Sequence, residues 1–183
     1  MTHVDKLWLR AVCSAPTSVA LATIGLLFCA PHSAGKAADQ VVAKPTPSTA
    51  DWPRWRGPNA DGVADGRNLP IRWSQTENVR WSLRLPGWGT SSPVVYRGRV
   101  FVTSQQAEGG KKSLLTLCFD RTNGRELWRH DFGFGVDQRT NPKSNLAANT
   151  PAITEDAVYV AFGNADIARY SHDGKLIWVT RYI

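Results

Sequence analysis

The sequence predicts an all-β fold built from a repeated four-stranded unit. After residue 50, short runs rich in Val, Thr, Trp, Tyr and Phe end at Gly, Asn or Asp, and no long stretch has the period of a helix. Three tryptophans, Trp81, Trp128 and Trp178, follow one another at spacings of 47 and 50 residues (128 − 81 and 178 − 128). In an all-β chain, a repeat of that length is typical of the blades of a β-propeller.

The most complete repeat is a hairpin. The apolar run 114–119 enters a turn at Asp120, passes Asn123 and Gly124, and leaves along a second strand that carries Trp128. Asp and Asn side chains bond to their own backbone in such turns, and Gly accepts the positive φ that they require. The large ring of Trp128 must then find a surface on which to pack.

The same pattern recurs further along the chain, and a partial copy of it precedes the hairpin. The downstream copy has a shorter turn, Asp173-Gly174, before Trp178, and the upstream echo places Trp81 in a strand at 77–85. The strands of the two fuller units are predicted at 91–96, 99–104, 113–120 and 125–131, then at 150–154, 157–162, 165–171 and 175–181. We expect a structural role, not a catalytic one, for the repeat residues Trp81, Asp120, Gly124, Trp128, Asp173, Gly174 and Trp178.

The chain divides into three parts. Residues 1–35 have a basic start, a 12-residue apolar core at 19–30 and small residues after it, as in a helical signal peptide that is cleaved on secretion. A retained membrane anchor is the alternative reading of this segment, and it would associate the chain with a membrane. Residues 36–50 are expected to be a disordered linker, and residues 51–183 hold the blades.

Two loops contain polar residues that suit binding. The connection 132–148 is long and rich in Gly and Asn, and long loops in compact folds are often functional. Its polar residues Arg139, Asn141, Lys143 and Asn145 are candidates to line one end of the domain, although a solvated connection between blades explains them as well. A calcium loop at Asn59, Asp61 and Asp65 is a second alternative, but it lacks EF-hand spacing and a terminal Glu.

Composition argues against several functions. The net charge of +7 comes from arginines that interleave with Asp and Glu, and without a basic block we predict no nucleic-acid partner. No HExxH, CxxC, GxSxG or P-loop motif occurs, and the four histidines lack metal-ligand spacing. If the signal is removed, Cys118 is the one cysteine left and is expected to be a buried apolar residue.

The pattern Asp–x–x–x–Gly–x–x–x–Trp at Asp120, Gly124 and Trp128 resembles the pyrroloquinoline-quinone-like (PQQ-like) β-propeller repeat. The opening WPRWRGPNADGV and the later TNPKSNLAANTPAI resemble secreted bacterial propellers of this family. The resemblance implies about seven or eight blades in a ring, with each outer-strand Trp packed between neighbours. Since about 130 residues at about 45 per blade make fewer than three blades, we expect an incomplete propeller, an N-terminal fragment whose remaining blades lie outside this chain.

The resemblance implies a non-catalytic scaffolding or binding module in the periplasm or cell envelope, with an envelope protein as partner and no cofactor. The alternative is a fragment of a PQQ-dependent quinoprotein dehydrogenase, which would use the quinone with calcium. Such enzymes typically show an adjacent Cys-Cys pair, and none occurs here. A propeller attached to a separate catalytic domain is the third possibility.

Overall fold

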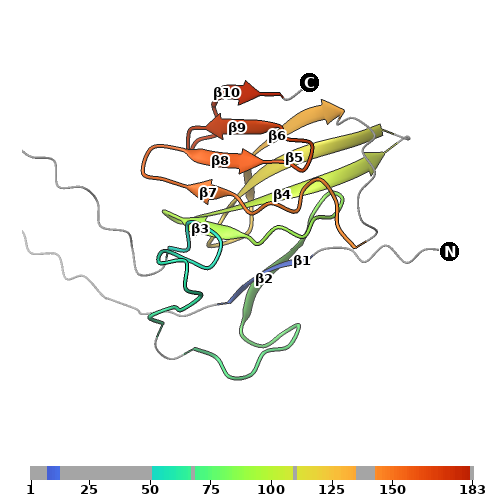
Figure 1. Cartoon of the computed structure of the whole chain (residues 1–183). Coiled ribbons are helices and arrows are strands. Elements are labelled where there is room, and N and C mark those ends of the chain that lie inside the picture. The colour runs from blue at the N-terminus through green and yellow to red at the C-terminus, as the bar shows by residue number, and fades with distance from the viewer. Residues whose placement is uncertain (1–7, 13–50, 67–68, 109–110, 135–142, 182–183) are drawn as a thin grey trace, which may run out of the picture.

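The computed structural model describes residues 8–12, 51–66, 69–108, 111–134 and 143–181. The regular structure of these residues consists of strands, and no helix occurs among them. Two four-stranded antiparallel sheets pack against each other, and a two-stranded ribbon lies beside the first of them (Figure 1). The prediction of an all-β, incomplete propeller with four-stranded units is therefore confirmed.

The first sheet contains β3 to β6 in chain order. Its strands are β3 (Val94–Tyr96), β4 (Arg99–Glu108), β5 (Lys111–Asp120) and β6 (Glu126–Phe134). The pairing register places Val94, Phe101, Cys118 and Trp128 in one row across the sheet. Residues paired in this way share a face of the sheet, because side chains alternate along each strand.

The second sheet repeats this plan. Its strands are β7 (Ala152–Ile153), β8 (Val158–Ala161), β9 (Ile167–Tyr170) and β10 (Leu176–Thr180). Here Ala152, Tyr159, Arg169 and Trp178 form the row that crosses the four strands. The two rows correspond position by position, and both end at the repeated Trp.

The ribbon joins β2 (Val79–Arg84), which carries Trp81, to β1 (Trp8–Val12). A helix was expected in the signal segment, and for residues 8–12 that expectation is wrong, because the edge of β2 gives this short stretch a hydrogen-bonding partner. The rest of segment 1–35 and the linker 36–50 lie outside the described residues. Within the described part of the chain, no helix has the length and apolarity needed to cross a bilayer.

The core has two parts, one on each face of the first sheet. Between the sheets, Phe101 and Cys118 pack with Val158, Val160 and Tyr170 of the second sheet. The opposite face contributes a cluster of Val100, Val102, Leu115, Leu117 and Phe119 with Leu85, against which Trp81 and Leu83 of β2 pack. Residues 114–119 are each at most 2% exposed. A strand buried on both faces reads as an unbroken apolar run, which explains the run seen in the sequence.

Candidate functional site

The first junction between repeats is formed by Trp81, which covers the turn between β5 and β6. Its indole Nε1 donates a hydrogen bond to the backbone oxygen of Arg121 at 2.8 Å. Below the ring lies Gly124, at φ 73°, where an added Cβ would lie 2.8 Å from the indole. Glycine is therefore required here twice, for the backbone conformation and for the close approach of the ring.

Asp120 and Asn123 hold the turn in the shape that receives Trp81. The Asp120 carboxylate Oδ1 accepts hydrogen bonds from the backbone N–H groups of Thr122 (2.7 Å) and Asn123 (3.3 Å). The Gly124 N–H donates to the Asp120 carbonyl at 2.9 Å, and Asn123 Oδ1 accepts from the Arg125 N–H at 2.9 Å. The local Asp and Asn chemistry expected from the sequence thus positions the carbonyl that binds the indole.

The second junction has the same two contacts one repeat later, an indole hydrogen bond to a turn carbonyl and a ring packed on a glycine. The indole Nε1 of Trp128, on β6, donates to the backbone oxygen of His172 at 3.0 Å, in the turn between β9 and β10. Gly174 has φ 92°, and a Cβ there would come within 2.6 Å of the Trp128 ring. The repeated Trp and Gly of the sequence therefore meet between sheets, each Trp on the Gly of the following unit.

The second turn is held by a different residue from the one expected. The sequence pattern matched Asp173 with Asp120, but the carbonyl that accepts the Gly N–H in this turn belongs to Ser171. Its Oγ accepts from the Lys175 N–H at 3.0 Å, and its carbonyl accepts from the Gly174 N–H at 3.1 Å. Asp173 lies exposed in the turn, and a side-chain hydrogen bond with Ser171 lowers the pKa of its carboxyl group. Sequence reasoning missed Ser171 because the shorter turn shifts the holding residue from four to three positions before the Gly.

Two histidines reinforce the second junction. The Nε2–H of His130 donates to the Gly174 carbonyl, and its ring stacks on Tyr170 with centroids 4.7 Å apart. His172 donates from Nε2 to the Thr154 carbonyl at 3.0 Å, and burial lowers the pKa of its imidazole. The Arg99 guanidinium donates to the His172 carbonyl, the acceptor that Trp128 also uses. Burial also shifts the pKa of the Tyr170 hydroxyl, which it raises because it disfavours the charged form.

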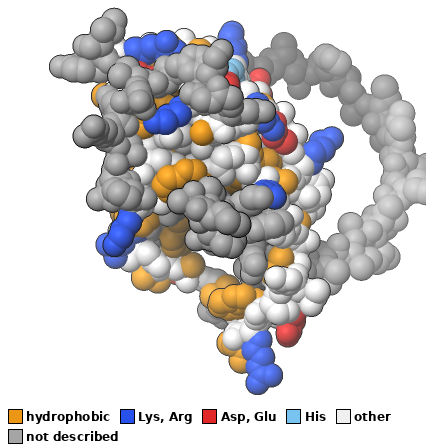
Figure 2. Space-filling model, turned by 90° about the vertical axis from the view of Figure 1, so that its right-hand side faces the viewer, with side chains coloured by type: hydrophobic (Ala, Val, Ile, Leu, Met, Phe, Trp, Pro, Cys, Tyr) orange, Lys and Arg blue, Asp and Glu red, His pale blue; other side chains and the backbone are white. Residues whose placement is uncertain are grey.

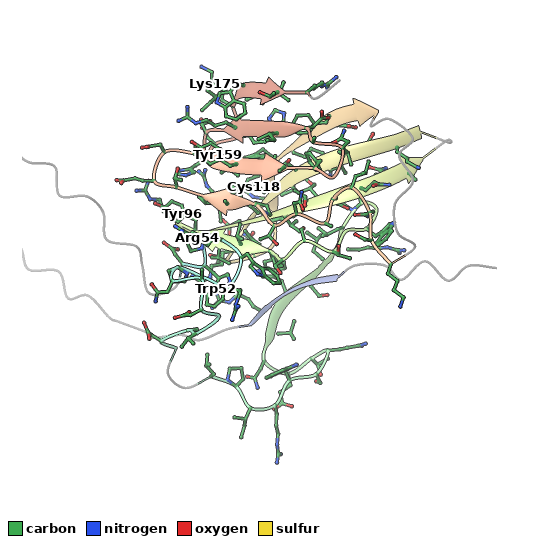
Figure 3. The ribbon with its side chains drawn as sticks, in the orientation of Figure 1. Trp52, Arg54, Tyr96, Cys118, Tyr159 and Lys175 are labelled. Atoms are coloured by element: carbon green, nitrogen blue, oxygen red, sulfur yellow. The ribbon has the colours of Figure 1, made fainter. Side chains whose placement is uncertain are left out.

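Trp178, the third repeated tryptophan, has no such turn beneath it among the described residues. It is 40% exposed, and the other apolar residues of β10, Leu176, Ile177 and Val179, are 38–44% exposed. Its ring lies near Tyr159 of β8, with centroids 6.4 Å apart, and the Arg169 guanidinium lies 5.9 Å from the centre of the Tyr159 ring. The side-chain view labels Tyr159, which lies in β8, and Lys175, which comes immediately before β10 (Figure 3).

Comparison with protein families gives one clear assignment. Residues 62–182 match the family model described as outer membrane protein assembly factor BamB. The chain belongs to this family. Its repeats are those of the PQQ-like β-propeller proteins, as the sequence pattern indicated, and this recognition is confirmed.

The BamB family also appears in the comparison with solved structures. The crystal structure of BamB from Moraxella catarrhalis aligns with 58% of this chain and 40% of its own, at 11% identity and a TM-score of 0.27. The chain therefore spans less than half of that protein. No curated protein matches the sequence.

The remaining candidates of this BamB-family chain are placed as follows. Asn145 is buried, donates to the Trp88 carbonyl at 2.7 Å and accepts from the Ala147 N–H at 2.9 Å, so it anchors the connection between the sheets. Arg139 and Asn141 lie outside the described residues. Lys143 is exposed and has an interaction of its own, so it is not a free cation.

The candidate calcium loop and the one remaining cysteine both contain residues with structural roles. Asp61 accepts the Val63 N–H at 2.9 Å through Oδ1 and holds an Asx turn with it. Among the described residues, no three His, Cys, Asp or Glu side chains gather in a way that suits a metal ion. Cys118 is fully buried between the sheets, and burial raises the pKa of its thiol to about 12. Figure 3 labels it in the first sheet.

Proposed function

We propose that this chain is a non-catalytic scaffolding or binding module of the bacterial cell envelope, in which the two sheets are neighbouring blades of a propeller completed by further blades. One observation carries the proposal. Four of the repeat residues, Trp81, Gly124, Trp128 and Gly174, are used to join one unit to the next. Because these four residues hold the units together, the edges and connecting loops of the repeat are left for contacts with a partner.

Family membership supports an envelope protein as the partner. The family description concerns the assembly of outer membrane proteins, and the segment 1–35 has the composition of a secretory signal. Charge gives no support to a nucleic-acid partner, because the described Lys and Arg side chains are dispersed over the face drawn in Figure 2. The proposed module works without a cofactor of its own.

The first test is the location of the protein in the cell. The full chain, with a C-terminal tag, is expressed in a bacterial host and followed by osmotic-shock fractionation and by the size change that signal cleavage produces. We expect the tagged protein in the periplasmic or membrane fraction. Retention in the cytoplasm at full size would contradict the proposal.

The second test identifies the partner and compares the enzymatic alternative. A photo-crosslinking amino acid replaces Ile71, which is 93% exposed, and in a control it replaces Tyr170, which is buried between the sheets. We expect a crosslink from position 71 to an envelope protein that copurifies with outer membrane protein assembly. Incubation with the quinone and Ca²⁺ should give no cofactor absorbance and no dye-linked alcohol oxidation, and turnover would favour the dehydrogenase alternative.

A further inference from the structure

We propose that Asn123 is a site of spontaneous chemical modification, which loses its side-chain amide when Trp81 leaves the turn, and that one of the two products keeps the first junction open. This modification goes beyond the proposed envelope function and does not depend on it.

Asn123 and Gly124 form the one Asn-Gly step in the sequence. Because glycine has no side chain to shield its backbone nitrogen, this nitrogen reaches the side-chain amide of a preceding Asn more easily than that of a larger residue does. Asn123 is exposed, and Gly124 is buried under the indole of Trp81. The second junction has Asp173 before Gly174, so that step has no amide to lose.

The reaction needs water as its co-reactant and nothing else. The backbone nitrogen of Gly124 gives up its proton and attacks Cγ of Asn123. As this N–Cγ bond forms, the Cγ–Nδ2 bond breaks, and the departing nitrogen takes up the proton and leaves as ammonia. Water then opens the resulting cyclic imide at one of its two carbonyl carbons. Opening at Cγ gives aspartate at position 123, and opening at the backbone carbonyl gives isoaspartate.

The closed junction opposes this reaction in three ways. The Gly124 N–H donates to the Asp120 carbonyl at 2.9 Å, and this bond is lost when the nitrogen gives up its proton. The side chain of Asn123 is held by the Arg125 N–H, from which Oδ1 accepts at 2.9 Å. The imide also requires the backbone of the Asn-Gly step to rotate. The Trp81 ring restricts that rotation, because it lies 2.8 Å from the position of a Gly124 Cβ.

Trp81 can leave its turn more easily than Trp128 can. It lies on β2, whose one strand partner among the described residues is the five-residue strand β1 (Figure 1). Trp128 belongs to a four-stranded sheet, and its release has to break the contacts between the two sheets. Local opening has a low free energy where few contacts are lost. The modifiable step therefore lies under the less supported of the two indoles.

The two products have different effects on the junction. Aspartate keeps the length of the backbone, and its carboxylate can accept from the Arg125 N–H as the amide oxygen does. Isoaspartate leads the main chain through its Cβ, which adds one carbon before Gly124. The glycine then no longer lies where Trp81 packs on it and where the Asp120 carbonyl accepts its N–H. Isoaspartate therefore turns a reversible opening into a permanent one.

The first measurement compares the rates of amide loss at Asn123 in the full chain, followed by mass spectrometry of its peptides. Four proteins are incubated at mildly alkaline pH: the original chain, Trp81→Phe, Trp81→Ala and Gly174→Ala, which disturbs the second junction alone. A synthetic peptide of residues 118–128 supplies the rate for an open turn. Circular dichroism checks that each protein is folded, and Trp81→Phe keeps the test valid if Trp81→Ala fails to fold.

We expect the original chain to react at least about tenfold more slowly than the peptide, because only its open population reacts. Trp81→Phe should speed the reaction about tenfold through loss of the indole hydrogen bond, and Trp81→Ala should speed it further through loss of the ring. Gly174→Ala should stay within about twofold of the original chain, since it changes a separate junction.

Three outcomes would overturn this control by Trp81. Equal rates in the original chain and the peptide would mean that the turn gives no protection. Equal rates in the original chain and the Trp81 variants would mean that the indole does not govern the reaction. A rise in Gly174→Ala as large as that in Trp81→Phe would assign the reaction to unfolding of the whole chain.

The second measurement tests the effect of the product on the junction. Amide hydrogen exchange over residues 79–84 is compared in the original chain, the purified isoaspartate form and Asn123→Asp. Isoaspartate should speed exchange at least about tenfold, because β2 no longer recloses on the turn, whereas Asn123→Asp should match the original chain. Equal exchange in the isoaspartate form and the original chain would overturn the permanent opening. Equally fast exchange in Asn123→Asp would overturn its assignment to the lengthened backbone.

Discussion

Gly174 offers the sharpest test of the junctions, because the chain contains a matched control. A methyl group at Gly174 would stand 2.6 Å from Trp128, whereas Gly98, which also has a positive φ (74°) in a turn, has nothing within 4 Å of its Cβ position. For Gly98→Ala the unfavourable backbone conformation costs about 1–2 kcal/mol. Gly174→Ala carries the same cost plus about 1–3 kcal/mol for displacing the ring. The loss of unfolded-state entropy on replacing Gly by Ala is common to both variants.

The free energies of unfolding are measured by urea titration, with far-UV circular dichroism and tryptophan fluorescence as independent signals. Gly174→Ala should destabilise the protein by about 1–3 kcal/mol more than Gly98→Ala. Because total stabilities of domains are about 5–15 kcal/mol, this difference is readily resolved. Gly124→Ala, beneath Trp81, should behave like Gly174→Ala. Equal losses for Gly174→Ala and Gly98→Ala would refute the idea that the glycine serves the indole of the preceding unit.

Three further predictions follow from the same contacts. Trp81→Phe keeps an aromatic ring but removes the hydrogen bond to the Arg121 carbonyl. The free energy of unfolding, measured in urea, should fall by about 1–2 kcal/mol. An unchanged value would mean that the indole N–H bonds to water in the unfolded chain as well as it bonds to this carbonyl in the folded chain. Burial lowers the pKa of His172 below its unfolded value of 6.5, so the unfolded state takes up the proton more readily. The free energy of unfolding should therefore fall as the pH drops below 6.5, and His172→Gln should flatten its pH dependence between pH 7 and 5. An identical pH dependence in the variant would contradict this. Burial raises the pKa of the Cys118 thiol to about 12. In a chain with Cys13→Ser and Cys29→Ser, this thiol should therefore react with a disulfide reagent only as urea unfolds the protein. Rapid labelling without denaturant would contradict the buried position of Cys118.

Much of the fold was predictable because the informative signals are local. The Asp120–Gly124 turn depends on side chains that bond to their own backbone, and such bonds are specified within a few residues. The unbroken apolar run 114–119 predicted a buried strand, and the Trp spacing predicted the order of the units. The strand limits differ from prediction by a few residues, with β7 reduced to two residues, because pairing partners decide where each strand ends.

The details of the junctions were not predictable, because they depend on contacts between distant parts of the chain. No local pattern shows that Ser171 takes over from Asp173, since a hydroxyl and a carboxylate can both hold a turn. The pairing of β1 with β2 joins segments about 70 residues apart and replaces an expected helix with a strand. Arg169 looks like a surface residue in the sequence, and only the register shows that it stands where the first sheet has Cys118.

The repeat period is therefore better understood as a property of interfaces than of strands. An isolated hairpin needs the glycine for its turn, but it has no need of a Trp exactly one unit earlier. The need for a Trp one unit earlier arises only when the indole of the preceding unit packs on the turn, as those of Trp81 and Trp128 do. Stability should then be distributed as in other repeat proteins, with each unit held by its neighbours. The first sheet has a neighbour on both faces, whereas β10 has none beyond Trp178 among the described residues. Local opening should consequently begin at β10 and reach the doubly covered strand β5 last.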